Sequence, residues 1–440
     1  MGVERHTDSV VEGRSAAAVD AAVRPIPAGR PGKPLRVLFI APQPFFRERG
    51  TPLRARNILR ALSEAGCRVD VLCYPFGDPL ELPGLRIIRS PRVPGIQDVR
   101  VGPSFAKVPL GALMSVKAFW LCLRNRYDVI HAVEEAAFFA VALKSIFGCK
   151  FVYNLDSFIS EHLEYSGFVK AKPVLQLARL VERVTIRGAN IGVTVGPDIS
   201  AKVRIISPRT TVLQLEDAPL NDTFDERKEE ADAIRGRLQL GAAPVILYAG
   251  NFGGYQGIDL LIRAAACVSR VRPDVRFVLV GGDAETIPAM TGLAESLGTS
   301  ENCIFTGRRP TPELGAYLTM ANFLVSPRTQ GTNTPLKIYD YMQSGRPIIA
   351  TNLLTHTQVL DESCAMLTAP EPEAFASGIL RMLNDSDLGA SLAAAAARRL
   401  DETYALPIFK RKVQTAYQRL WPPDLDAAHV ADGAPGSQRV

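Results

Sequence analysis

The stretch from Ala321 to Asn352 constrains the fold most, because it has the pattern of a strand, a loop, a helix and a second strand. Its first apolar run, at 323–325, is short and bounded by polar residues and proline, as a buried strand is. A helix is predicted from Thr334, a good N-cap, with Pro335 in the first helical position. Gly345 ends this helix, and a second apolar run follows. We therefore expect one βαβ unit of a parallel sheet.

Two charged residues stand at the start of this predicted helix. Lys337 lies in the first turn, where free N–H groups favour a negative partner and a cation costs roughly 0.3–1 kcal/mol. A bound phosphate would reverse that sign, because a helix start after a parallel strand is a common anion site. Asp340 lies three residues further on the same helix face. The pair fits a nucleotide diphosphate, and an intrahelical ion pair on a solvated face is the alternative.

Length and composition bound the class of protein. A chain of 440 residues is long enough for two domains, and 47% hydrophobic with 22% charged residues is ordinary for a globular protein. The net charge of +6 permits acidic substrates or a membrane surface but does not indicate nucleic acid. Seven scattered cysteines, without metal-ligand spacing, predict a reducing compartment and no disulfide framework. We see no signal peptide and no apolar run of ~18 residues, and so expect a cytoplasmic protein.

Strand and helix patterns alternate along the chain in two successive sets, which predicts an α/β protein of two Rossmann-like domains facing each other across a cleft. Ligands of such sheets bind at the carboxyl ends of the strands. The pattern is weak over 211–230, where we expect a connection. The expected parts are a disordered tail at 1–34, an N-terminal domain at 35–215, a C-terminal domain at 216–405, a helix at 406–421 that packs back on the first domain, and a disordered tail at 422–440.

Candidate residues of the N-terminal domain follow its strands. Gly50 and Thr51 lie in the loop after the first strand, where a glycine would let the backbone approach a diphosphate closely. A simple turn is the alternative role for Gly50. Asp156 stands at the carboxyl end of a later strand, where ligands of such sheets bind. Alternatively, Asp156 caps the helix that begins at 157–160.

A helix predicted over 110–126 is too short and too charged to cross a bilayer. Its apolar face could touch a membrane surface, or the helix could simply pack on the sheet. The residues of interest are Phe119 and Trp120, flanked by Lys107, Arg124 and Arg126.

From Leu35 to Trp421 the chain resembles the family 4 glycosyltransferases of the GT-B type. The resemblance rests on segments that follow in the family's order and spacing, and a long last helix also suits a GT-B chain. These segments are YAGNFGGYQGIDLLIRA at 248–264, FVLVGG at 277–282, IFTGRRPTPELGAYLTMANFLVSP at 304–327 and KIYDYMQSGRPIIATN at 337–352.

The chain departs from the family pattern at several positions. The family usually has two acids eight positions apart before this last strand; Asp340 matches the second, and Thr332 stands in place of the first. Asn251 and Gln256 replace the basic residues usual in the Gly-rich loop. Where the family usually has a histidine after an N-domain strand, this chain has Asp156. These departures leave the donor sugar and the catalytic details open.

The resemblance implies a transferase that moves a sugar from a nucleotide-diphosphate sugar to a hydroxyl acceptor, with retention and without metal or cofactor. Stabilising the diphosphate as it leaves requires positive groups or N–H donors. The acceptor would be a glycan or a lipid-linked molecule of envelope polysaccharide or glycolipid synthesis, with contact to the inner face of a membrane as a further expectation. The implied residues are Asp156 and Lys337 for catalysis and Asp340, Asn251, Gly253, Gln256, Arg328, Thr334, Leu336, Gly50 and Thr51 for donor binding.

Two other functions compete with this interpretation. The missing acid and the neutral residues Asn251 and Gln256 would suit a GT-B protein that binds a nucleotide sugar without turnover. Both residues could also satisfy only the backbone of their own loop, and Arg328 could point into solvent. A nicotinamide-dependent oxidoreductase is disfavoured, because neither domain has G-x-G-x-x-G between its first strand and helix.

Overall fold

The computed structural model describes residue 26 and residues 33–45, 50–99, 104–165, 169, 171–221, 223–331 and 333–421; of residues 50, 51 and 165 it describes the backbone alone. Most of the two predicted tails lies outside these residues, as does Thr332. Ile26, which falls inside the predicted N-terminal tail, is buried in the hydrophobic core of the N-terminal half.

Parallel strands form the sheet of the N-terminal half, and their apolar sequences suit strands covered on both faces. In spatial order the strands are β3 (Leu85–Arg89), β2 (Arg68–Cys73), β1 (Arg36–Ala41), β4 (Val129–Val133), β5 (Lys150–Leu155), β6 (Ile191–Thr194) and β7 (Thr211–Gln214). The sequence predicts only a connection over 211–230, so β7 corrects that prediction. β7 has a weak pattern because it is short and pairs with β6 alone at the sheet edge.

A second parallel sheet forms the C-terminal half. In spatial order its strands are β10 (Cys303–Gly307), β9 (Arg276–Val280), β8 (Val245–Ala249), β11 (Phe323–Ser326), β12 (Ile348–Thr351) and β13 (Met366–Thr368). The predicted βαβ unit of 321–352 is β11, α11 and β12. Two parallel α/β sheets confirm the predicted fold class of two Rossmann-like domains.

Helices cover both faces of the first sheet, each over its own hydrophobic core. On one face lie α1 (Gly50–Glu64) and α15 (Leu406–Gln418). On the other lie α2 (Lys107–Arg124), α3 (Ala137–Phe147), α5 (Lys172–Gly188) and α6 (Pro197–Ile206), while α4 (Ile159–Tyr165) follows β5 and packs on α5. α1 begins at Gly50, so the predicted loop after β1 ends earlier than expected; Pro52 is tolerated there because it falls in the first helical turn.

The second sheet is covered in the same way. One face carries α8 (Ile258–Ser269), α9 (Thr286–Ser296) and α13 (Pro372–Asn384), and the other α7 (Lys228–Arg237), α10 (Leu314–Met320) and α11 (Lys337–Gln343). The short α12 (Leu354–Thr357) follows β12, and α14 (Ser386–Arg399) contributes to both cores. Within the described residues, no helix is both long and apolar enough to cross a membrane.

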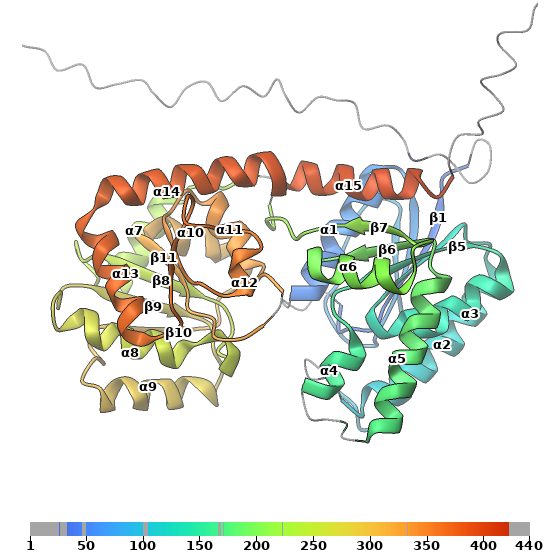
Figure 1. The fold of residues 1–440 in the computed structure, drawn as a ribbon, viewed down its shortest axis with the longest axis horizontal. Coiled ribbons are helices and arrows are strands. Elements are labelled where there is room, and N and C mark those ends of the chain that lie inside the picture. Colours follow the sequence, from blue (N-terminus) through green and yellow to red (C-terminus); the bar gives the residue numbers. More distant parts are fainter. Residues whose placement is uncertain are drawn as a thin grey trace, which may run out of the picture.

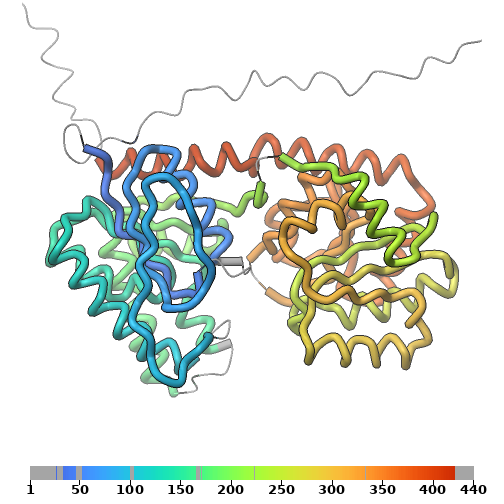
Figure 2. The backbone as a smooth tube through the Cα atoms, turned by 180° about the vertical axis from the view of Figure 1, so that it is seen from behind, coloured from blue at the N-terminus to red at the C-terminus, as the bar shows by residue number. Residues whose placement is uncertain are grey.

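The two domains lie side by side, and the C-terminal helices connect them along one side of the molecule (Figure 1). The chain leaves α14, passes through η5 (Leu400–Tyr404) and enters α15, which lies against the first domain (Figure 2). There, the hydroxyl of Tyr417 lies 2.7 Å from Nδ1 of His131, a buried residue of β4. This contact and the apolar face of α15 fix the last helix to the N-terminal domain.

Each sheet has one point where the strand order reverses. In the first sheet the chain runs outward from β1 to β3 and then returns to place β4 on the other side of β1. In the second sheet β8 and β11 have the same relation. Ligands of open α/β sheets bind at the carboxyl ends of the strands at such switch points. The two switch points are therefore the places to look for a functional site.

Candidate active site

The loops that follow β8 and β11 meet at the carboxyl edge of the second sheet, because these two strands are neighbours. The loop after β8 contains a short 3-10 helix, η3 (Gly254–Gln256), and continues at Gly257. Gly257 has a φ of 70°, and a Cβ atom there would lie 2.0 Å from the carbonyl oxygen of Pro327. Only glycine fits this approach. The Gly-rich loop is thus held against the loop that carries Arg328.

Lys337 begins α11, and its side chain reaches back to the loop after β8. Its Nζ donates a hydrogen bond to Oε1 of Gln256 at 3.3 Å and lies 3.8 Å from the ring centre of Tyr248. A Cβ atom at Gly250 would lie 2.9 Å from the same Nζ. Burial, and then the nearby charge of Arg328, hold the pKa of Lys337 well below its usual value. A bound anion would favour the charged form of Lys337 and so raise this pKa.

Arg328 lies beside Lys337, and it is buried with 7% of its surface exposed. Its Nη1 donates to the carbonyl of Asn333 at 2.7 Å and to the hydroxyl of Thr355 at 2.8 Å. Its guanidinium carbon lies 5.0 Å from the ring centre of Tyr255. The alternative that Arg328 points into solvent is therefore wrong. Burial lowers the pKa of Arg328.

The charges at this edge are uncompensated. Within the described residues, neither Lys337 nor Arg328 forms an ion pair with a carboxylate. Each instead contacts aromatic rings and neutral oxygens. Two cations in a partly buried site repel each other, and an anion placed between them would gain from both.

The start of α11 differs from its prediction. Thr334 does not cap the helix, and Pro335 is not its first residue, because α11 begins at Lys337 with Leu336 in the cap position. The N–H groups of Ile338 and Tyr339 donate to the carbonyls three residues earlier, so the chain enters through a tight turn before the α-helical pattern begins. Thr334 and Leu336 therefore belong to the entry of the helix, close to Lys337 in the chain.

The polar residues of the Gly-rich loop have different partners. Oδ1 of Asn251 accepts from the N–H of Gly253 at 3.0 Å, so this side chain braces its own loop, as one alternative holds. The hydroxyl of Tyr248 donates to the carbonyl of Asn251 at 2.7 Å. Gln256 is buried and its Oε1 faces Lys337 and Tyr248, so it does not serve its own backbone alone. Gln256 thus positions the ammonium of Lys337.

Asp340 faces the segment that connects the two domains. Its Oδ1 accepts from the N–H of Leu220 at 3.0 Å, and Gln343 donates to the carbonyl of Asn221 at 3.0 Å. Burial raises the pKa of Asp340 to about 7, against the effect of the bond from Leu220. Asp340 and Lys337 form no ion pair in the described residues, so the intrahelical pair is wrong.

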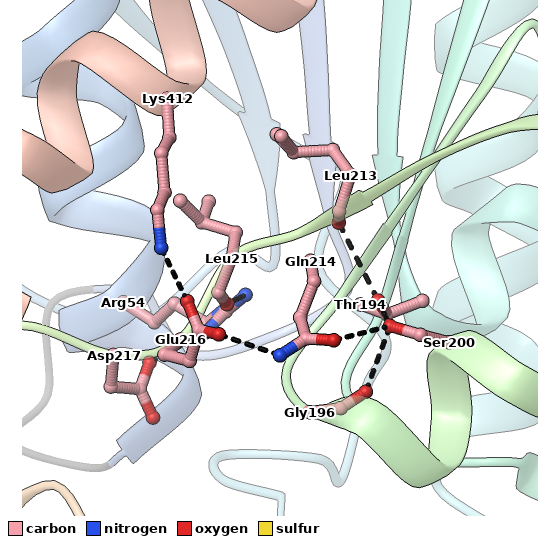
Figure 3. A network of polar contacts seen from close by, with 10 residues as sticks. All are labelled: Arg54, Thr194, Gly196, Ser200, Leu213, Gln214, Leu215, Glu216, Asp217 and Lys412. Carbon is pink, nitrogen blue, oxygen red and sulfur yellow. Dashed lines mark hydrogen bonds and ion pairs between the residues drawn. The ribbon is translucent and has the colours of Figure 1, made fainter. Parts of the chain in front are cut away.

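The connecting segment is held from both sides, as Figure 3 shows. Lys412 of α15 donates to Glu216 at 2.7 Å, and Arg54 of α1 donates to Asp217 at 2.7 Å and also bonds the carbonyl of Leu215. Arg54 is almost fully buried. These contacts place the connection, and with it Asp340, next to α1 of the N-terminal domain.

Asp156 stands just after β5, at the carboxyl edge of the first sheet. Its Oδ1 accepts from Nδ2 of Asn154 at 2.8 Å and lies 3.4 Å from Nε of Arg54. Arg54 thus lies between Asp156 and Asp217, and both carboxylates share its single positive charge. Gly50 and Thr51, also predicted to face the donor, are described by their backbone alone.

Sequence reasoning missed Glu134, which lies directly after β4 at the switch point of the first sheet. Its backbone has a φ of 47°, a left-handed conformation that costs a non-glycine residue about 1–3 kcal/mol. Its carboxylate accepts from Nε2 of Gln43, the second residue after β1, at 3.2 Å. Burial, then Glu135 and Asp156, raise the pKa of Glu134 to about 8. The position at a strand end was the available signal.

A cavity of about 710 Å³ lies between α4, α5 and α6 of the N-terminal domain. Its lining includes Phe158, two residues after Asp156, and it is otherwise rich in charged side chains. Among these are Glu161, Arg179, Glu182, Arg183 and Lys202.

Two family models match the chain, one for each domain. Residues 49–215 match the glycosyl transferase 4-like domain, and residues 243–385 match the glycosyl transferases group 1. Alpha-D-kanosaminyltransferase of Streptomyces kanamyceticus is 25% identical over 191 residues, which cover 42% of this chain and 49% of that protein. The GDP-mannose-dependent alpha-(1-6)-phosphatidylinositol monomannoside mannosyltransferase of Mycolicibacterium smegmatis is 33% identical over 111 residues, 25% of this chain and 29% of that protein. The chain thus matches about half or less of these relatives' length.

Solved structures extend the likeness to the whole fold. Sucrose-phosphate synthase from Thermosynechococcus elongatus has a TM-score of 0.72 at 21% identity, over 88% of this chain and 99% of that one. Anabaena HepE in complex with UDP has a TM-score of 0.69 at 16% identity, over 88% of this chain and 100% of that one. At these identities the structures show a shared fold. From its two matched domains and this fold, the chain belongs to the glycosyltransferases of the GT-B type.

Proposed function

We propose that this protein transfers a sugar from a nucleotide-diphosphate sugar to a hydroxyl acceptor, with retention and without a metal. The observation that carries the proposal is the pair Lys337 and Arg328 at the second switch point, with no carboxylate partner in the described residues. A diphosphate is the anion that would compensate them. The names of the relatives support a sugar transferase, and a GT-B neighbour is known in complex with UDP.

In this proposal the donor lies on the C-terminal domain. Lys337, held by Gln256, would bind the diphosphate and stabilise the charge that develops on it as the sugar leaves. Asp340 would bind ribose hydroxyls through Oδ2, while Oδ1 keeps the N–H of Leu220. The other predicted donor contacts would line this pocket; they are Asn251, Gly253, Arg328, Thr334 and Leu336, with Gly50 and Thr51 facing it from the N-terminal domain.

The acceptor would lie on the N-terminal domain. Asp156 would orient the reacting sugar or the acceptor hydroxyl, because it stands at the carboxyl edge close to the connection with the donor half. The cavity beside Phe158 offers the acceptor a polar binding surface. A glycan or lipid-linked acceptor of envelope synthesis, a cytoplasmic location and contact with the inner face of a membrane stay parts of the proposal.

A GT-B protein that binds nucleotide sugars without turnover is the second candidate. It is favoured by the neutral residues Asn251 and Gln256, because Asn251 braces its own loop instead of offering a charge. Turnover separates the two functions, since both predict nucleotide binding.

The test is a panel of nucleotide-diphosphate sugars in a thermal-shift assay, followed by measurement of nucleoside diphosphate release with simple sugar acceptors. A ligand at 100 times its dissociation constant should add about 2.7 kcal/mol to the free energy of unfolding. We expect one donor class to stabilise the protein and to be consumed, with the product anomer matching the donor by NMR. Stabilisation without release across donors and acceptors would favour the inactive binding protein, and no stabilisation by any nucleotide would contradict both.

A further inference from the structure

Large hydrophobic side chains are exposed mainly on one part of the molecule. Among the described residues, those outside this part are Tyr255, Val271 and Leu354. All the others lie between residues 105 and 205, on or next to the helices α2, α3, α5 and α6; they are Phe105, Val108, Val116, Phe119, Trp120, Leu123, Ile146, Val174, Leu177, Leu180, Val184 and Ile205. This concentration needs an explanation, because a monomeric protein rarely exposes a large apolar patch.

Helix α2 is apolar on two opposite sides. One side packs into the core of the first domain through residues such as Met114 and Leu121. The exposed residues Val116, Phe119, Trp120 and Leu123 follow the spacing i, i+3, i+4 and i+7, so they form a single stripe on one side of the helix. A helix that only covers a sheet needs one apolar side. The second stripe is therefore available to another surface.

Helix α5 repeats this arrangement. Its exposed residues Val174, Leu177, Leu180 and Val184 recur at helical spacing, while Leu175 and Ile186 are buried on the other side.

Helix α3 joins α2 and α5 into one layer. The rings of Phe119 and Phe147 lie 5.6 Å apart between α2 and α3. Lys144 of α3 donates to the carbonyl of Gly188 in α5 at 2.7 Å. A Cβ atom at Gly188 would lie 2.3 Å from the side chain of Val141, so α3 and α5 approach closely there. We call the outer side of α2, α3 and α5 the docking face.

The docking face is predominantly basic. Its three helices carry eight lysines and arginines, and the only acid in them, Glu182, is buried against Ser160. In the described part of the chain, two of the eight bases form ion pairs with carboxylates of neighbouring segments. Lys117 and Arg124 lie 4.9 and 4.0 Å from the ring centre of Trp120, which stands half exposed between them. Basic residues beside exposed aromatic and aliphatic side chains are the composition of a helix that lies in a membrane interface.

We propose that the docking face binds the surface of a membrane rich in anionic lipids. The apolar stripes would enter the boundary between headgroups and acyl chains, and the basic residues would contact lipid phosphates. A second copy of this chain fits less well, because a symmetric contact would set these like charges against each other.

The docking face also lies next to the proposed acceptor side. Arg183 and Ile205, both exposed, line the cavity between α4, α5 and α6, and Phe158 lines it near Asp156. A membrane contact would therefore place this cavity at the lipid surface, where a membrane-borne acceptor could enter. Both steps rest on the proposed function, which already includes a membrane contact, but vesicle binding is measured without any sugar transfer.

Flotation of the full chain with vesicles tests the proposal. We expect binding to vesicles of phosphatidylglycerol and phosphatidylcholine, weakened by salt, and much less binding to phosphatidylcholine alone. In a Trp421→Phe background, Trp120 is the only tryptophan, and its emission should shift to shorter wavelength on binding. Equal binding to neutral vesicles, or none to anionic ones, would overturn the proposal.

Matched substitutions locate the surface. Leu123→Glu and Leu177→Glu should each lower vesicle binding tenfold or more, because they place a carboxylate in the apolar stripes. Val271→Glu is the control, since Val271 is 64% exposed and Leu123 66%, but Val271 lies in the C-terminal domain. Nucleoside diphosphate binding should be equal in all three, so a failure of the donor site is distinguished from a failure of this surface. Unchanged vesicle binding in both leucine variants, or self-association that they abolish in place of vesicle binding, would contradict the proposal.

Discussion

The two switch points of this molecule have the same backbone arrangement and opposite charge. At the second sheet, Lys337 and Arg328 face the Gly-rich loop, and no carboxylate of the described part of the chain pairs with either. At the first sheet, Glu134 and Asp156 stand at the ends of neighbouring strands, and Nε of Arg54 lies 3.4 Å from Oδ1 of Asp156. The fold sets where a ligand can bind, and a few side chains set which ligand it is.

The two sheet edges also differ in how far their charged side chains are paired within the protein. Arg54 forms ion pairs with both Asp156 and Asp217, so these two carboxylates already share a cation without a ligand. The second edge holds two cations whose pKa values are both lowered by burial. A bound anion should therefore alter the charge balance of the second edge more than that of the first. Substitutions at the second edge should weaken donor binding, and substitutions at the first edge should slow sugar transfer.

The largest expected effect is on diphosphate affinity in Lys337→Ala. Losing charge-assisted hydrogen bonds costs about 1.5–3 kcal/mol, so the affinity for a nucleoside diphosphate should fall by roughly tenfold to 150-fold. The affinity for the uncharged nucleoside should change little. Lys337→Arg should restore only part of the loss, because a planar fork does not replace a compact ammonium. Calorimetry with both ligands measures the contrast, and equal losses would place the phosphates elsewhere.

Diphosphate binding should depend on pH through Lys337. Burial lowers the pKa of Lys337 and a bound anion would raise it, so binding should weaken as the pH rises through the range in which free Lys337 loses its proton, and proton uptake on binding should grow over the same range. Calorimetry in two buffers with different heats of ionisation detects this uptake. The same proton uptake in Lys337→Ala would show that another group is responsible.

Next in size is the effect of Asp156→Asn on transfer. We expect the turnover number to fall about tenfold, which is roughly 1.4 kcal/mol, while donor affinity changes less than twofold. Asp217→Asn is the control, since it removes the other carboxylate beside Arg54 but leaves the strand end intact. If both variants slow transfer equally, Asp156 acts only through Arg54.

Asp340 should give a pH-dependent stability difference of about 1 kcal/mol, after a discount for its partial exposure. The folded protein raises the pKa of Asp340 to about 7, above an unfolded value near 4, so it binds the proton more tightly than the unfolded chain. Protonated Asp340 therefore adds to the free energy of unfolding below about pH 4, and this contribution is lost as the pH rises to about 7. Asp340→Asn cannot lose this proton, so its free energy of unfolding in urea should rise relative to that of the native protein as the pH increases across this range. A constant difference would mean that Asp340 does not titrate there.

The smallest expected change in stability is for Glu134→Gly. Glycine adopts positive φ freely, so the lost contact with Gln43 should be largely offset and the unfolding free energy should stay within about 1 kcal/mol or rise. Glu134→Gln keeps the Cβ atom and should be no more stable than the glycine variant. If transfer falls in both variants, the carboxylate serves function; full activity in both would leave it a structural residue.

Local sequence patterns predicted much of the fold. The unit at β11, α11 and β12 was predictable because a buried strand and a glycine stop are local signals. The pairing of Gln256 with Lys337 was not predictable, because 81 positions separate them and only the parallel pairing of β8 with β11 brings their loops together.

Burial and backbone strain were the main reasons for the remaining errors. Arg328 is buried by contacts with Thr355 and Tyr255, which its own loop sequence does not indicate. Glu134 is special through its backbone conformation, and glutamate has no sequence signature for positive φ. The weak pattern of β7 reflects an edge strand whose pairing is set by the sheet.

The central claim is that the second switch point holds the nucleotide diphosphate, and hydrogen exchange with and without a nucleoside diphosphate tests it most directly. Saturating ligand should protect the amides of 250–257 and 328–340 in the native protein and in Asp156→Asn. In Lys337→Ala the same protection should require a ligand concentration roughly tenfold to 150-fold higher. Protection confined to the N-terminal domain, or protection of these segments that survives Lys337→Ala unchanged, would contradict the account.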